Sequence, residues 1–152
     1  MDRTAIQDVI YRTCLLLDEK NFDAFLDLCD EEFRYSITTH STEIRKDMIW
    51  LDHDKKGMRN LFDQLPRHNS DHSPITRHAT VYKVEVDEGR REASVVSVLQ
   101  VYKTDLDGGA TALFAVGKYV DTIKLDSGKP RLVKRVVRLD TRMLGIGYHI
   151  PF

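Results

Sequence analysis

Cysteine is scarce in this chain, which has only Cys14 and Cys29 among its 152 residues. Both fall at apolar positions of helical patterns, so we expect buried free thiols in a cytoplasmic protein and no disulfide. Long apolar runs are also missing, since no stretch of eighteen apolar residues occurs. The N-terminus "MDRTAIQDVI" carries early charges and is typical of an amphipathic helix. We therefore expect neither a membrane span nor a signal peptide.

The chain has no excess of charge of one sign. Its 23 basic and 24 acidic residues are interleaved, and the formal net charge is −1. This distribution gives no electrostatic indication of a nucleic-acid or membrane partner. Apolar residues make up 41% and charged residues 31%, as in a soluble globular protein. With no linker, repeat or low-complexity segment, the length predicts a single domain over residues 1–152.

The first third of the sequence predicts helices. One apolar face recurs at i, i+3, i+4, i+7 and i+11 and consists of Ile6, Val9, Ile10, Thr13 and Leu17. A shorter repeat of the same kind consists of Phe22, Phe25, Leu26 and Cys29. Alternation in "FRYSIT" (33–38) then predicts a strand. A third helix is expected over 54–65, ended by Pro66.

After residue 75 the sequence predicts four long strands. The segments 75–86, 91–104, 110–125 and 131–144 are rich in Val, Thr and Tyr and are joined by "DEGR", "DLDGG" and "DSGKP". These short turns predict an antiparallel meander. Val96 and Val98 oppose Val95 and Leu99, so one strand is apolar on both faces. Such a sheet must curl or be covered on both sides, and the N-terminal helices supply one cover.

Helices followed by a strongly curved antiparallel sheet predict an α+β protein. This order resembles the cone-shaped nuclear-transport-factor-2-like fold, with the helices packed on the sheet. The fold hosts enzymes, binding modules and structural subunits, so it does not by itself give the function.

A closer resemblance covers nearly the whole chain. "LLLDEKNFDAFLDLCDEEFRYSI" (15–37) resembles the opening of the small, or beta, subunits of Rieske-type ring-hydroxylating oxygenases. "ITRHATVYKVE" (75–85) is similar to their Thr-Arg-His strand start. "GKYVDTIKLDSGKPRLVKRVVRLD" (117–140) resembles their Gly-x-Tyr-x-Asp, turn, Arg-Leu-x-x-Arg-x-x-x-Leu-Asp ending. The polar "HNSDHS" before "TRH" and the tail "MLGIGYHIPF" depart from the common aromatic-dioxygenase members, which makes carboxylates or sulfonates candidate substrates.

The resemblance implies a structural subunit without catalytic residues. In that family a large alpha subunit carries the Rieske [2Fe–2S] cluster and the mononuclear iron, and hydroxylates an organic substrate with O2 and NAD(P)H-derived electrons. The small subunit packs beneath it in an α3β3 assembly, which also implies self-association as a trimer. The residues agree, because a Rieske cluster needs two Cys and two His, and Cys14 and Cys29 have no histidine within ten positions.

The segment "PRHNSDHSPITRH" (66–78) holds three histidines and an aspartate. His68, Asp71 and His72 could contribute to a two-His-one-carboxylate iron site. The histidine spacing suits a helix, whereas "NSDHSP" favours a turn, so we expect a polar surface loop and no metal. His78 follows Arg77 at a strand start, where a buried or interface histidine is expected.

A stand-alone dehydratase or isomerase in the same fold is the alternative. Such an enzyme would use an acid, a base and a tyrosine inside the cone. The residues that could serve are Tyr11, Tyr35, His78 and Asp121. Asp121 shares a strand face with Tyr119, and the competing interpretation is an acid that faces solvent or pairs with Arg135.

The C-terminal "LGIGYHIPF" (144–152) has apolar residues at every second position and no Lys, Arg, Asp or Glu. A free tail of this kind would be an aggregation hazard. We therefore expect it to be ordered and buried, along its own sheet or against a neighbouring subunit.

Overall fold

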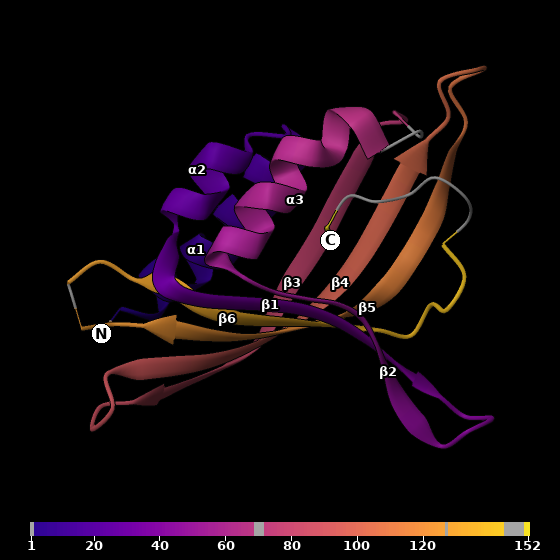
Figure 1. The fold of residues 1–152 in the computed structure, drawn as a ribbon. Helices are drawn as coiled ribbons and strands as arrows, with labels where there is room; N and C mark the ends of the chain where they lie inside the picture. Colours follow the sequence, from indigo (N-terminus) through magenta and orange to yellow (C-terminus); the bar gives the residue numbers. More distant parts are fainter. Residues whose placement is uncertain (1, 69–71, 127, 145–150) are drawn as a thin grey trace.

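Three helices cover one face of a curved six-stranded sheet within the residues that the structure, a computed structural model, describes (Figure 1). These residues are 2–68, 72–126, 128–144, 151 and 152. The helices are α1 (Arg3–Asp18), α2 (Phe22–Asp27) and α3 (Lys55–His68). The strands are β1 (Cys29–Ser41), β2 (Lys46–Asp54), β3 (Ile75–Asp87), β4 (Glu92–Thr104), β5 (Thr111–Lys124) and β6 (Arg131–Leu139). This arrangement confirms the predicted α+β class. None of the helices in the described part of the chain is long and apolar enough to cross a membrane.

The first two helices form where the apolar periodicity predicts them, except that α2 ends at Asp27. Cys29, predicted at a helical position, is instead the first residue of β1. The Asp2 side chain caps α1 by accepting from the Thr4 amide at 2.9 Å, and Asn21 caps α2 by accepting from the Ala24 amide at 3.3 Å. The predicted face of α1 is buried throughout, and it consists of Ile6, Val9, Ile10, Thr13 and Leu17. The helices are therefore held mainly by the apolar surface that they bury against the sheet.

The prediction that Pro66 ends the third helix was wrong, because α3 continues to His68. Proline removes its own N–H, so the helix loses one hydrogen bond in its last turn. The buried face of α3, formed by Met58, Phe62 and Leu65, holds the helix against β1 despite that loss. The Phe62 ring stacks on Phe22 with centroids 4.2 Å apart, which ties α3 to α2.

The sheet has the strand order β2-β1-β6-β5-β4-β3. Strands β3 to β6 form the predicted antiparallel meander. Two features differ from the prediction. Strand β1 pairs with β6 in parallel, so the sheet is not wholly antiparallel, and β2 is an additional strand that pairs with β1. The parallel pairing sets Tyr35 beside Arg135, and β6 in turn sets Arg135 beside Asp121.

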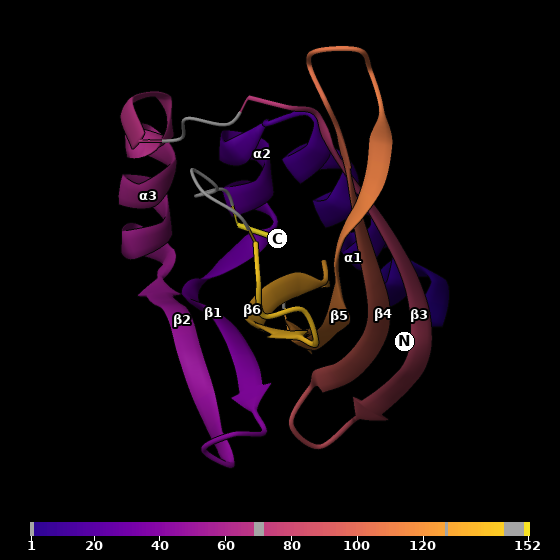
Figure 2. The same cartoon turned by 90° about the vertical axis from the view of Figure 1, so that its right-hand side faces the viewer.

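The two faces of the sheet differ in exposure. Val95 and Leu99 point toward the helices and are fully buried. Val96 and Val98 point to the outer face and are half-buried in the single chain. Figure 2 shows the three helices on the inner side of the sheet, which leaves the outer side uncovered by any described helix. The structure thus has a cone-like interior and an outer sheet face that carries apolar side chains.

Candidate functional site

A buried ion pair lies inside the cone. The guanidinium of Arg135 donates from Nε to Asp121 Oδ1 at 2.9 Å and from Nη2 to Asp121 Oδ2 at 3.0 Å. Both side chains have no exposed surface. The guanidinium also lies over the Tyr119 ring, 3.7 Å from its centroid. The strand register places the pair between Tyr35 on one side and Val95 on the other.

This pair suits a structural role better than a catalytic one. Burial alone lowers the pKa of Arg135, but the charge of Asp121 raises that pKa above its usual value. The guanidinium therefore stays protonated and occupies both oxygens of the carboxylate. Burial also raises the pKa of Tyr119 well above its usual value, so its hydroxyl stays neutral. A general base needs an oxygen that can reach a substrate proton, and the Asp121 carboxylate is fully buried against Arg135.

The structure does not bring together the four residues of the enzyme alternative. Tyr35 and Asp121 are buried in the interior. Tyr11 is 42% exposed on α1, where its hydroxyl accepts from the Val81 amide at 3.2 Å. His78 is exposed on β3, so the expectation of a buried histidine was wrong, and an interface role remains a prediction. A site inside the cone would have to work without Tyr11 and His78.

The metal candidates of the histidine-rich segment fall at the border of the described residues. Asp71 and the side chain of His68 lie outside them. His72 is exposed. Among the residues whose placement is described, no group of three or more His, Cys, Asp or Glu side chains could hold a metal ion.

The two thiols do not fit the ligand set of a Rieske cluster. Cys14 and Cys29 are free and buried, as predicted. The Cys29 thiol donates to the Phe25 carbonyl at 3.3 Å. Burial raises the pKa of both thiols, and it raises that of Cys29 to about 12. A metal ligand must be a thiolate, so the interior of this chain disfavours the form that iron would require.

We expect both thiols to be inert in the native chain. Because each is buried and protonated at neutral pH, alkylation by iodoacetamide should be about 100-fold slower than in the urea-unfolded chain. Mass spectrometry of intact protein over time measures this ratio. Native Cys14→Ser and Cys29→Ser variants, each with one thiol left, serve as controls. Native labelling at the unfolded rate would contradict the assignment of buried thiols.

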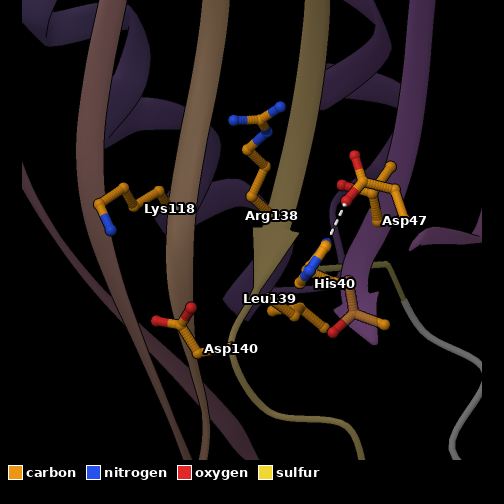
Figure 3. A pocket seen from close by; sticks show the side chains of 8 residues that line it. His40, Asp47, Lys118, Arg138, Leu139 and Asp140 are labelled. Atoms are coloured by element: carbon orange, nitrogen blue, oxygen red, sulfur yellow. Dashed lines mark hydrogen bonds and ion pairs between the residues drawn. The ribbon is translucent and has the colours of Figure 1, made fainter. Parts of the chain in front are cut away.

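A surface pocket of about 410 Å³ opens on the outer side of the sheet, where β1, β6 and β5 meet (Figure 3). Its lining is Thr38, Thr39, His40, Asp47, Lys118, Arg138, Leu139 and Asp140. The His40 ring nitrogen Nδ1 lies 2.9 Å from Asp47 Oδ1. Thr38, Arg138 and Lys118 are cross-strand neighbours on β1, β6 and β5. Along the same row, Val98 on β4 is the partner of Lys118, and Ile49 on β2 is the partner of Thr38. Ile49 is 67% exposed. Charged and apolar side chains side by side on an exposed sheet face are typical of a subunit contact.

The end of the predicted C-terminal segment is buried inside the cone. Phe152 has no exposed surface, and its ring stacks on Phe114 with centroids 6.3 Å apart. Residues 145–150 lie outside the described residues, so the predicted strand-like pattern is not tested there. The burial of Phe152 agrees with the prediction that the C-terminal segment is buried. The Phe114 ring that it contacts belongs to the same chain.

The two sequence comparisons with known proteins agree on one family. Residues 12–145 match the family model described as ring hydroxylating beta subunit. The chain is 40% identical to the methanesulfonate monooxygenase hydroxylase subunit beta of Methylosulfonomonas methylovora, over 97% of this chain and 85% of that one. It is 34% identical to the 2-aminobenzenesulfonate 2,3-dioxygenase subunit beta of Alcaligenes sp, over 99% of both chains.

A solved structure supports the same fold. The beta subunit of the benzoate 1,2-dioxygenase from Burkholderia mallei aligns with a TM-score of 0.67 and 18% identity, over 91% of each chain. At this identity the likeness shows the fold, and it confirms the cone-shaped architecture inferred from the sequence. In oxygenases of this family the Rieske cluster and the mononuclear iron lie in the alpha subunit. The chain belongs to the ring hydroxylating beta subunit family and is the beta subunit of the hydroxylase component of a multicomponent oxygenase.

Proposed function

We propose that this beta subunit serves an oxygenase that hydroxylates an organosulfonate with O2 and electrons from NAD(P)H. The observation that carries the proposal is that both beta subunits reported above, at 40% and 34% identity, are named for a sulfonate substrate. The departures in "HNSDHS" and in the C-terminal tail from the common aromatic-dioxygenase pattern support it. The role proposed for the chain is assembly, and the bidentate engagement of Asp121 by Arg135 supports a structural role for that carboxylate.

We further propose that residues 1–152 act as one domain in a cytoplasmic α3β3 hydroxylase, in which three beta subunits contact one another. The outer sheet face supports this arrangement because Ile49, Val96 and Val98 are partly exposed there in the single chain. In a trimer with closed rotational symmetry, each subunit can bury this face against a neighbouring subunit, so no copy of the face is left uncovered. Two free buried thiols support a reducing compartment.

The substrate proposal is tested by co-expression with the alpha subunit. The large open reading frame next to this gene is expected to contain Cys-x-His and Cys-x-x-His motifs. The purified complex, with a reductase and NADH, should consume O2 when methanesulfonate or 2-aminobenzenesulfonate is added. Product analysis then separates monooxygenation from dioxygenation. O2 consumption with benzoate and none with either sulfonate would contradict the proposal.

The assembly proposal predicts a clear effect of Val98→Glu. This change places a charge in the centre of the outer sheet face, so we expect loss of the trimer and elution as a 17.6 kDa chain. Light scattering coupled to size exclusion measures the mass. Leu106→Glu is the matched control, because Leu106 is 67% exposed in the turn between β4 and β5. A Val98→Glu variant with the mass of the wild-type assembly would contradict a contact at this face.

A further inference from the structure

We propose that β2 is the docking edge for a short extended segment of the alpha subunit, which adds to the sheet as an additional strand. The choice of partner rests on the three-fold assembly proposed above. The proposal concerns main-chain groups at the edge of the sheet, whereas the contact between beta subunits uses side chains on the outer sheet face. Figure 1 shows β2 at the margin of the sheet, in the hairpin with β1 that extends beyond the helices.

The opposite edge of the sheet is closed by side chains of α1. Strand β3 pairs with β4 on one side and lies beside α1 on the other. Three hydrogen bonds, spread along β3, join its main chain to side chains of α1. They run from the Arg77 amide to Asp18 Oδ1 (3.1 Å), from the Val81 amide to the Tyr11 hydroxyl (3.2 Å) and from Arg3 Nη1 to the Val84 carbonyl (2.7 Å). Another strand therefore cannot pair with β3 at these positions.

The β2 edge has no such cap. Strand β2 pairs with β1 on one side, and no side chain of the described residues hydrogen-bonds to a main-chain group of β2. None of its nine residues is buried. An edge strand in this position presents a row of unpaired N–H and C=O groups, which are the groups that an extended peptide binds when it adds to a sheet.

The composition of β2 indicates that a protein partner covers it. Its centre is "MIWL" (48–51), four successive apolar residues of which none is buried. Asp47 and Asp52 border this centre, and each contacts a basic side chain of β1 on the exposed surface. An apolar centre inside a charged rim is typical of a protein–protein contact. An exposed edge strand with such a centre would otherwise be an aggregation site.

Symmetry favours the alpha subunit as this partner. Pairing of β2 with β2 of a second beta subunit needs a two-fold axis, which a closed three-fold ring does not contain. Pairing of β2 with β3 of a neighbouring beta subunit is opposed by the α1 side chains that already bond to β3. The alpha subunit is the remaining component of the hydroxylase. Because the register of β2 with β1 skips Trp50, this bulge suits an added strand of only a few residues.

Hydrogen–deuterium exchange at single-residue resolution tests the proposal, because it measures individual main-chain amides. The full-length beta chain is compared with its purified complex with the alpha subunit. In the complex, alternate amides of residues 46–54 should exchange about 100-fold more slowly than in the beta chain alone. The Arg77 and Val81 amides on β3 are the control, since α1 side chains already bond them, and they should exchange equally in both samples.

Two results of the exchange experiment would overturn the proposal. If the β2 amides are already slow in the beta chain alone, a second copy or another segment of this chain occupies the edge. If they exchange equally fast in both samples, no strand is added. A photo-activated benzoylphenylalanine in place of the exposed Lys46 identifies the partner in the complex, and it should cross-link to the alpha subunit. Cross-links to beta subunits alone would also overturn the proposal.

Light scattering of the beta chain alone separates this proposal from the assembly proposal. A beta chain that is monomeric alone, yet gains slow β2 amides and cross-links in the complex, would contradict the three-fold contact between beta subunits. The same result would still place the alpha subunit on β2. A stable trimer whose β2 amides stay fast in the complex would support the three-fold contact and overturn the added strand.

Discussion

The Asp121→Ala variant is expected to lose about 3–5 kcal/mol of unfolding free energy. Removing the carboxylate leaves the Arg135 guanidinium charged, fully buried and without its two strongest hydrogen bonds. The pair lies in the middle of the sheet, between β4 and β1 in the strand register, so water cannot reach the freed charge without opening the cone. Urea unfolding followed by circular dichroism measures the loss.

The double variant Asp121→Leu with Arg135→Met is the control. It removes both charges and keeps apolar volume, so we expect it to recover most of the stability that Asp121→Ala loses. Arg34→Ala is a second control, because Arg34 forms an exposed pair with Asp52 and its removal should cost less than about 1 kcal/mol. If Asp121→Ala loses less unfolding free energy than Arg34→Ala, the buried pair contributes little to stability.

The sequence predicts the local part of the fold well. The apolar faces of the helices and the four strands of the meander follow from periodicities of 3.6 and 2, which depend only on neighbouring residues. The interpretation of Asp121 as a partner of Arg135 is also correct. In this case the two residues lie on adjacent antiparallel strands joined by a short turn, so a local register brings them together.

The missed features depend on contacts between distant segments. Strand β2 has an exposed, charge-rich pattern because it is an edge strand, and the same pattern fits a loop. The parallel pairing of β1 with β6 joins residues about one hundred positions apart, and no turn signal encodes it. The burial of Phe152 was foreseen, but its position inside the cone depends on Tyr35 and Arg77, which no period-two pattern identifies.

The Gly-x-Tyr-x-Asp motif noted in the sequence has a structural explanation. Its three named residues, Gly117, Tyr119 and Asp121, occupy alternate, buried positions of β5. Asp121 pairs with Arg135, and Tyr119 lies under the same guanidinium. Gly117 stands opposite Leu139, where β5 and β6 approach closely. The motif thus secures the pairing of β5 with β6.

The Gly117→Ala variant should therefore be destabilised by about 3 kcal/mol or more, near the upper end for an overpacked site. A Cβ at residue 117 would clash with the Arg138 carbonyl oxygen and lie 2.9 Å from the Leu139 Cα, both of which are backbone atoms. Backbone atoms in a paired strand cannot rotate away, so β6 would have to shift, and the Arg135 contact with Asp121 would shift with it. Thermal unfolding of the purified variant measures the effect.

Gly89→Ala is the matched control for this change. A Cβ there meets only the flexible Asp87 carboxylate at 3.4 Å, so we expect a change within about 0.5 kcal/mol. The comparison isolates the close approach of β5 to β6 from the general effect of replacing glycine by alanine. If Gly117→Ala unfolds with the same midpoint as Gly89→Ala, the close approach is not required, and the glycine of the motif needs another explanation. A large loss at Gly117 alone would establish that this glycine, like Asp121, serves to join β5 to β6.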